Sequence, residues 1–79
     1  MECNNDRVRS IVDGLGDKEP LEAYQTLIEE NCFGRAMIYD VGGKYLVYMK
    51  DEENACIEET NSINRARDLA KAFVDSVCS

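Results

Sequence analysis

The chain has 79 residues, of which 44% are hydrophobic, and it carries a formal net charge of −7. This length makes one small domain over residues 1–79, and the apolar fraction is sufficient for a folded core, which argues against disorder. The negative charge repels phosphate, so it disfavours direct binding to nucleic acid or to an anionic membrane and favours a basic protein partner. No apolar run approaches the ~20 residues that span a bilayer and the polar N-terminus lacks a signal-peptide core, so we expect a cytoplasmic protein.

The N-terminal half of the chain predicts two helices. Residues 4–16 begin with Asn4 or Asn5 as a cap and can end at Gly14 or Gly16. Residues 17–34 have Pro20 where a first helical turn tolerates it, preceded and followed by acidic residues that suit the positive end of a helix. Apolar residues recur at helical spacing in both segments: Val8, Ile11, Val12 and Leu15 in the first, and Leu21, Tyr24, Leu27, Ile28 and Cys32 in the second.

The C-terminal half predicts three strands followed by a helix. Residues 35–41 and 44–50 are rich in β-branched and aromatic residues and flank Gly42-Gly43, which suits a two-residue turn with positive φ. Residues 54–59 form a third strand after an acidic turn, and residues 61–79 form a helix with Asn61 or Ser62 as its cap. We therefore predict an α+β fold: a two-layer α-α-β-β-β-α arrangement with a three-stranded antiparallel meander packed on helices.

Both faces of the predicted sheet are apolar, whereas a sheet covered on one side usually alternates apolar with polar residues. With Val41 opposite Lys44, one face carries Met37, Tyr39, Val41, Leu46, Tyr48 and Ile57, and the other carries Ala36, Ile38, Tyr45, Val47, Met49 and Cys56. We assign the first face to the helical layer. The second face either lies under the short N-terminal helix or meets another chain, as an exposed apolar patch of this size often does.

The four cysteines, Cys3, Cys32, Cys56 and Cys78, form no CxxC pair, and the chain has no histidine, which disfavours a zinc site. Two interpretations remain open. In a reduced protein the cysteines are small apolar fillers. In an oxidising compartment two disulfides can form, and among the three pairings we favour Cys32 with Cys56 and Cys3 with Cys78, because the latter joins the chain ends.

No pattern in the sequence predicts an enzyme, a metal site or a cofactor. The acidic runs are Glu29-Glu30, Asp51-Glu52-Glu53 and Glu58-Glu59; neighbours on a strand point to opposite faces and turn residues are solvated, so these carboxyls are not paired in a pocket. The chain has no histidine to act as a base near neutral pH. The basic residues Arg65, Arg67 and Lys71 on the last helix make either a solvated face with local ion pairs, such as Asp68 with Lys71, or a weak anion-binding ridge.

The strand-turn-strand-turn-strand-helix pattern over residues 35–77 resembles part of a double-stranded-RNA-binding fold and the HicB-type antitoxins. That RNA-binding fold has a lysine-rich start to its last helix, whereas this chain has SINRAR there, so RNA binding is not carried over. Small size, strong acidity and a meander with flanking helices also resemble phage-encoded anti-CRISPR inhibitors, several of which block a nucleic-acid-binding surface with acidic side chains. This resemblance implies that Asp51, Glu52, Glu53, Glu58 and Glu59 stand in for phosphates.

The sequence thus predicts a non-enzymatic protein–protein interaction module. Its first interpretation is an acidic inhibitor, a nucleic-acid mimic that docks on a basic surface of a nuclease or defence complex. The alternative is a dimeric regulatory or antitoxin-like protein that uses the second sheet face as a homodimer interface. The predicted partner-binding residues combine carboxylates with apolar anchors: Asp51, Glu52, Glu53, Glu58, Glu59, Ile38, Tyr45, Val47 and Met49.

Overall fold

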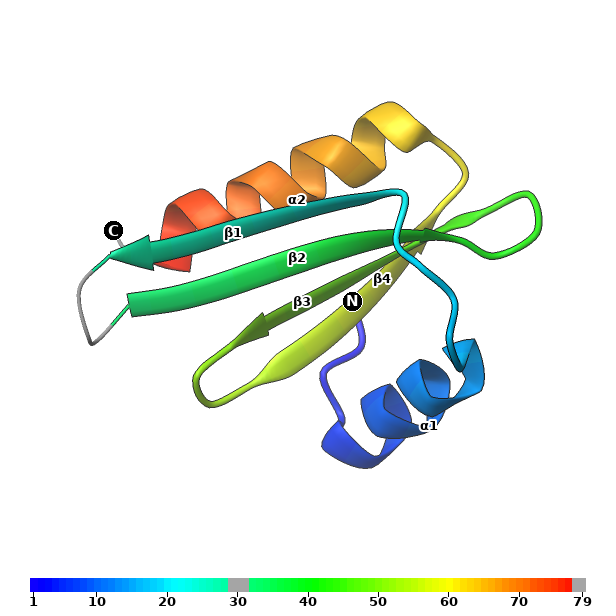
Figure 1. Cartoon of the computed structure of the whole chain (residues 1–79), viewed down its shortest axis with the longest axis horizontal. Coiled ribbons are helices and arrows are strands. Elements are labelled where there is room, and N and C mark those ends of the chain that lie inside the picture. Colours follow the sequence, from blue (N-terminus) through cyan, green and yellow to red (C-terminus); the bar gives the residue numbers. More distant parts are fainter. Residues whose placement is uncertain (29–31, 78–79) are drawn as a thin grey trace.

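The computed structural model describes residues 1–28 and 32–77 and contains two helices and four strands. Its elements in chain order are α1 (Asn5–Leu15), β1 (Glu22–Ile28), β2 (Cys32–Asp40), β3 (Tyr45–Asp51), β4 (Ala55–Thr60) and α2 (Ile63–Val77). The strands form one antiparallel sheet in the order β1-β2-β3-β4 (Figure 1). The predicted α+β class and antiparallel meander packed on helices are confirmed, although the sheet has four strands and not three.

The second predicted helix is wrong, because residues 22–28 form the edge strand β1. Tyr24, Thr26 and Ile28 are residue types that favour strands. They recur at a spacing of two, which is the period of a strand, so the same segment fits a strand as well as a helix. In the register, Glu22 lies opposite Ile38 and Tyr24 lies opposite Ala36. Pairing with β1 gives β2 a hydrogen-bonded strand on each side. These tertiary contacts override the local helical pattern of residues 22–28.

The glycine-pair hairpin between β2 and β3 is confirmed. Gly42 and Gly43 have φ values of 79° and 89°, and the Val41 N–H donates a hydrogen bond of 2.9 Å to the carbonyl of Lys44. Asp40 then lies opposite Tyr45, so the predicted register of the two strands holds. The predicted division of the apolar residues between the two sheet faces follows from this register.

At both ends of α1 and at the start of α2, the structure selects one of the two cap residues that the sequence offers. The side chain of Asn4 accepts a hydrogen bond of 3.1 Å from the Arg7 N–H and so caps α1. The α1 helix ends at Gly16, whose φ is 58°. The hydroxyl of Ser62 accepts a hydrogen bond of 3.3 Å from the Arg65 N–H at the start of α2.

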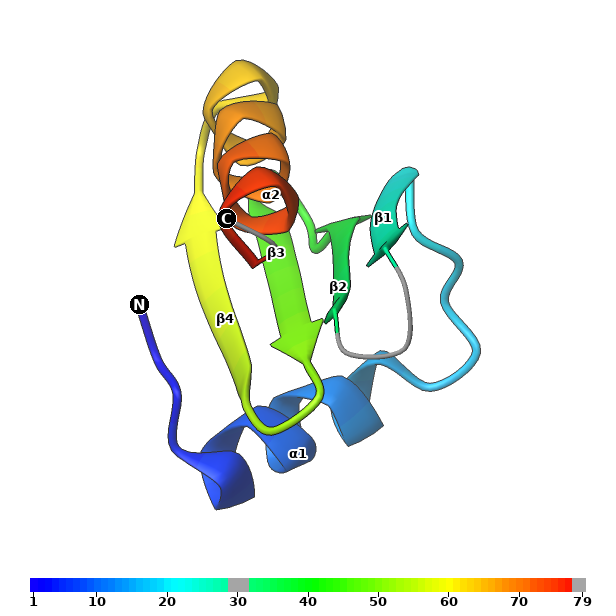
Figure 2. The same ribbon diagram turned by 90° about the vertical axis from the view of Figure 1, so that its left-hand side faces the viewer.

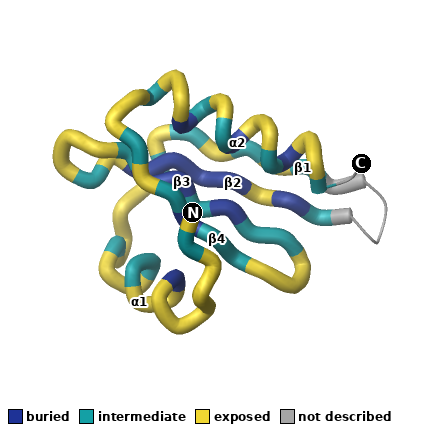
Figure 3. Tube along the Cα trace, turned by 180° about the vertical axis from the view of Figure 1, so that it is seen from behind, coloured by how far each residue is buried: buried dark blue, intermediate teal, exposed yellow. Residues whose placement is uncertain are grey.

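The two helices cover opposite faces of the sheet (Figure 2). Ala66, Ala70 and Val74 of α2 pack on the second face, and their small side chains let the helix approach closely. Val8 of α1 packs on the first face. The expected assignment of faces to helices is therefore inverted, and β2 and β3 are the most enclosed strands (Figure 3). The buried residues form two clusters: Ala36, Ile38, Val47, Met49, Ala66, Ala70 and Val74 under α2, and Val8, Met37, Tyr39, Leu46 and Ile57 under α1.

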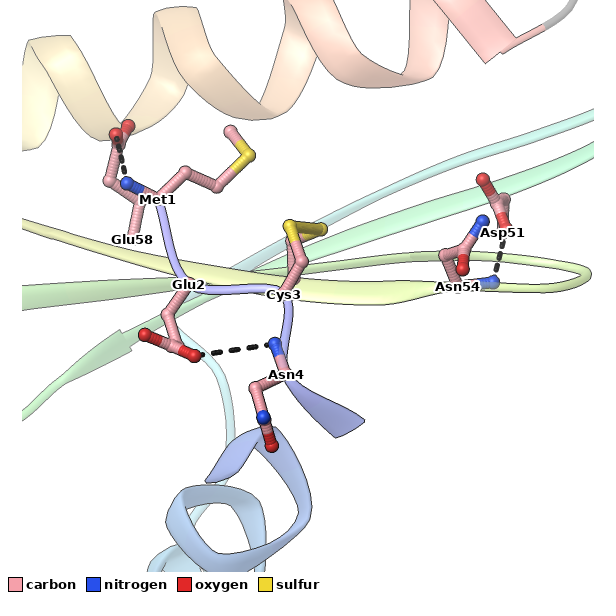
Figure 4. Close-up of a disulfide and its surroundings, with 8 residues drawn as sticks. Met1, Glu2, Cys3, Asn4, Asp51, Asn54 and Glu58 are labelled. Carbon is pink, nitrogen blue, oxygen red and sulfur yellow. Dashed lines mark hydrogen bonds and ion pairs between the residues drawn. A yellow bond between two sulfur atoms is a disulfide. The ribbon is translucent and has the colours of Figure 1, made fainter. Parts of the chain in front are cut away.

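The N-terminal segment pairs with the outer edge of β4. Glu2 and Ile57 exchange two backbone hydrogen bonds of 2.8 Å. The next residue, Cys3, forms a disulfide with Cys56 on the side of the sheet that α2 covers (Figure 4). The favoured pairing of Cys56 with Cys32, and of Cys3 with Cys78, is therefore wrong. Cys78 and the side chain of Cys32 lie outside the described residues.

Candidate protein-docking site

The apolar residues predicted to anchor a partner are enclosed within the monomer. Ile38 and Val47 are completely buried, Met49 is 1% exposed, and all three lie beneath α2. Tyr45 is half-buried and packs against the same cluster. The prediction that these four side chains form an exposed docking surface is wrong, because α2 already covers them. A homodimer built on this face would have to displace α2.

The β3–β4 turn presents two free carboxylates. Asp51 is used inside the turn, where its Oδ1 accepts hydrogen bonds of 2.8 Å from the Glu53 N–H and 2.7 Å from the Asn54 N–H. Glu52 and Glu53 are exposed, and no side-chain hydrogen bond or ion pair joins their carboxylates to another described residue. Of the predicted site residues in this turn, Asp51 therefore stabilises the turn, whereas Glu52 and Glu53 face solvent.

Glu58 and Glu59 lie apart from the turn and point to opposite sides of the sheet. Glu58 is opposite Val47, on the α2 side, and one of its oxygens lies 3.6 Å from the N-terminal ammonium. The other oxygen of Glu58 is buried and has no hydrogen-bond partner among the described residues. Glu59 is opposite Leu46, on the α1 side, and is exposed. The five predicted carboxylates therefore do not share one surface.

The turn carboxylates border an open hollow that two apolar residues also line. Phe33 of β2 and Val77 of α2 line it together with Asp51, Glu52 and Glu53, and its volume is about 170 Å³. We call this site the acidic hollow. The negative end of the α2 dipole lies beside it, and the last turn of α2 contains no basic residue. Carboxylates, helix carbonyls and two apolar residues suit the charged head and the aliphatic stem of a lysine or arginine.

Sequence reasoning missed Phe33 and Val77 as site residues. Val77 lies in the helix that the sequence predicts for residues 61–79, and Phe33 lies in the segment 17–34 that it predicts as a helix, so neither pattern indicates a site residue. Gly34, the neighbour of Phe33 in β2, brings Val77 to this part of the sheet: a Cβ built on Gly34 would lie only 2.9 Å from a methyl carbon of Val77, so only glycine allows the end of α2 to lie this close to β2. A lone glycine in the sequence does not reveal that contact.

The predicted basic ridge on the last helix is partly engaged within the fold. Arg67 Nε donates to both oxygens of Glu22, at 3.1 and 2.8 Å, and Arg67 Nη2 lies 2.6 Å from Oε2. The Tyr24 hydroxyl donates to the same carboxylate. The hydrogen bond from Arg67 holds the pKa of Glu22 below its usual range, and the hydrogen bond to Glu22 raises the pKa of Tyr24. Arg65 and Lys71 are exposed.

Comparisons with protein-family models, curated proteins and solved structures found no match to this chain. Across residues 1–28 and 32–77, no three histidine, cysteine or acidic side chains are grouped so as to hold a metal ion. Neither described helix has the length and apolar character needed to cross a membrane. The case for function therefore depends on the geometry and charge of the acidic hollow.

Proposed function

We propose that this chain is a non-enzymatic protein–protein interaction module, an acidic inhibitor that docks through the acidic hollow on a basic, nucleic-acid-binding surface of a nuclease or defence complex. The observation that carries the proposal is the pair of exposed carboxylates on Glu52 and Glu53, which are unpaired among the described residues and line one hollow with Phe33 and Val77. This class includes the phage-encoded anti-CRISPR inhibitors that the chain resembles in architecture and charge.

The division of labour within the site follows from its chemistry. Solvent-exposed carboxylates contribute mainly to the rate of encounter with a basic surface, because solvent and salt screen them. Phe33 and Val77, which line the hollow, contribute the apolar contact that retains the partner once it has docked. These two residues replace the buried Ile38, Val47 and Met49 as candidate anchors.

The regulatory or antitoxin-like alternative receives less support in the form in which it was predicted. It requires the second sheet face as a homodimer interface, and α2 covers that face.

The test is competition with target DNA for a panel of purified RNA-guided nuclease complexes. For a complex that the wild-type chain inhibits, Glu52→Gln/Glu53→Gln should weaken inhibition, with an association rate reduced about tenfold or more at low salt. Raising salt from about 50 mM to about 300 mM should slow association of the wild type markedly. Phe33→Ala should instead speed dissociation.

The matched control is Asp17→Asn/Glu19→Gln, which removes the same charge from an exposed segment between α1 and β1. This variant should inhibit like the wild type. Association that is insensitive to salt, or equal effects of the two double variants, would remove the acidic hollow as the docking site. Circular dichroism verifies that each variant is folded before its kinetics are compared.

A further inference from the structure

The two edges of the sheet differ in how far the chain itself covers them. The edge at β4 is paired with the N-terminal segment through Glu2 and is locked there by the disulfide. The edge at β1 has no strand beyond it among the described residues, and Figure 2 shows it at the rim of the sheet opposite β4. An uncovered edge strand is a template for pairing with another chain.

The backbone groups that face outward from β1 can be assigned from the hydrogen-bond alternation. The Val41 N–H donates to Lys44, so odd-numbered residues of β2 direct their backbone groups toward β3 and even-numbered ones toward β1. Through the register, Glu22, Tyr24 and Thr26 face β2. The N–H and C=O of Ala23 and Gln25 therefore point away from the sheet.

The composition of β1 does not protect this edge. Natural edge strands are commonly blunted by charged residues, proline or a covering element. The only charged residue in β1 is Glu22, and Arg67 of α2 already binds its carboxylate. Next to the start of the strand, Leu21 is 54% exposed, and Ala23 is exposed as well. The edge thus combines free backbone groups, low net charge and accessible apolar side chains.

We propose that the β1 edge is a homodimer interface, at which two copies of the chain pair their β1 strands antiparallel and join their sheets into one of eight strands. Antiparallel pairing of identical strands is self-complementary, so a two-fold axis satisfies both edges at once and closes the assembly. Pairing along the whole strand places Glu22 opposite Ile28 of the second copy and Gln25 opposite its equivalent. It forms up to about six main-chain hydrogen bonds.

Charge favours this edge over other surfaces of the molecule. Each copy carries −7, so two copies repel one another wherever acidic residues meet. Near β1 the charges are mixed: Arg35 lies opposite Gln25 in the register, Arg67 and Lys71 of α2 are close enough to act on Glu22, and the acidic pair Glu29-Glu30 follows the strand in the sequence. No like charges oppose one another in the proposed strand pair. Higher salt should therefore strengthen the dimer by screening the remaining repulsion, the reverse of its effect on docking at the acidic hollow.

The first test measures mass against concentration by sedimentation equilibrium. The wild type should change from 8.9 kDa to twice that mass with a Kd of about 10 µM to 1 mM, as expected for a small interface. Gln25→Pro removes an outward N–H without removing a hydrogen bond to β2, so it should remain monomeric and folded. Gln25→Ala keeps that N–H and should dimerise.

The second test uses the unmodified chain, so it stands even if the proline variant fails to fold. Amide hydrogen exchange at Ala23 and Gln25 should slow as protein concentration rises, whereas Tyr24 and Thr26, bonded to β2, should be protected at every concentration. A wild type that stays monomeric to about 1 mM would overturn the proposal. So would a dimer whose Gln25 amide exchanges freely, or a folded Gln25→Pro variant that dimerises like the wild type.

Discussion

At the scale of single residues, the carboxylate of Glu22 connects the edge strand to the helix above it. Glu22 belongs to β1 and Arg67 to α2, 45 positions apart in the sequence, and they meet through hydrogen bonds from Arg67 Nε to both carboxylate oxygens. Such two-point recognition fixes geometry as well as charge. Because the side chains remain partly exposed, at 43% for Arg67 and 28% for Glu22, solvent screens the contact.

The pH dependence of stability tests this contact. The pKa of Glu22 in the folded chain lies below its ordinary value of 4.5, so the stabilisation is fully present above that pH and is lost as pH falls through the folded value. We expect wild type to be more stable than Glu22→Gln at pH 7, with a gap that narrows below about pH 4.5. Urea unfolding of both proteins from pH 7 to pH 3 measures this difference in the free energy of unfolding.

The partner deletion Arg67→Met provides the control for this experiment. With the guanidinium gone, exchanging Glu22 for glutamine should leave a smaller pH-dependent difference in unfolding free energy, namely the part that the Tyr24 hydrogen bond to Glu22 sets. A gap between wild type and Glu22→Gln that stays constant from pH 7 to pH 3 would show that the ion pair does not set the pKa of Glu22.

Residue-scale predictions from the sequence succeeded where they depended on strand alternation. Glu58 and Glu59 were expected on opposite faces, and they lie opposite Val47 and Leu46 on the two sides of the sheet. The partner of Cys56 was not predictable in this way. Its pairing with Cys3 depends on the N-terminal segment lying along β4, and a three-residue stretch before a helix cap carries no periodicity that indicates a strand.

At the scale of elements, β1 shows why local pattern misled. Residues 17–34 contain a proline where a first helical turn tolerates it and apolar residues at helical spacing, yet residues 22–28 form a strand. Short apolar runs satisfy both periods, so the choice depends on neighbours far away in the sequence. The hairpin and α2 were predictable, because a glycine pair dictates the turn and a 15-residue helix gives a long apolar stripe.

The packing of α2 on β2 can be tested at Gly34. An alanine Cβ there would lie 2.9 Å from the Val77 Cγ2 atom and 3.0 Å from its Cβ, so the end of α2 must shift. Gly34→Ala should reduce the free energy of unfolding by about 1–3 kcal/mol, as overpacked cores do. Val77→Ala in the same chain should recover part of this loss, with a coupling of about 1 kcal/mol in a double-mutant cycle.

Gly14→Ala is the matched control, since a Cβ there meets nothing within 4 Å. Gly14 lies within α1, where alanine favours the helix, so this change should stabilise the chain by about 0.5–1 kcal/mol. Equal effects of the two glycine substitutions, measured by urea unfolding, would rule out the close approach of Val77.

At the scale of the whole molecule, the apolar character of both sheet faces has a simple explanation. One helix covers each face, so the pattern that suggested an exposed docking surface reflects a sheet enclosed on two sides. What the sequence could predict of the candidate site is the acidic turn, because a turn exposes its charges. The presence of Phe33 and Val77 in the acidic hollow could not be predicted, because it depends on residue 33 belonging to a strand and on the packing of α2 against β2.

The disulfide acts at this same scale, because it joins positions 53 apart and holds the N-terminal segment on the edge of β4. A cross-link that closes a loop of this length restricts the unfolded chain and typically contributes about 2–4 kcal/mol. Disulfides are typical of oxidising compartments, whereas the sequence led us to expect a cytoplasmic protein. The cytoplasmic location therefore stays a prediction.

Cys3→Ser/Cys56→Ser should therefore lower the free energy of unfolding by about 2–4 kcal/mol in urea. Because the segment that carries Glu2 then loses its covalent anchor, the Ile57 amide, which donates to the Glu2 carbonyl, should exchange much faster with solvent. The amide of Met37, which β2 directs toward β3 and away from the disulfide, serves as the internal reference for global unfolding. Unchanged stability together with an unchanged Ile57 exchange rate would mean that the backbone pairing holds the segment without the disulfide. Faster exchange at Ile57 alone would show that the disulfide holds this edge locally, because a global loss of stability accelerates the exchange of both amides together.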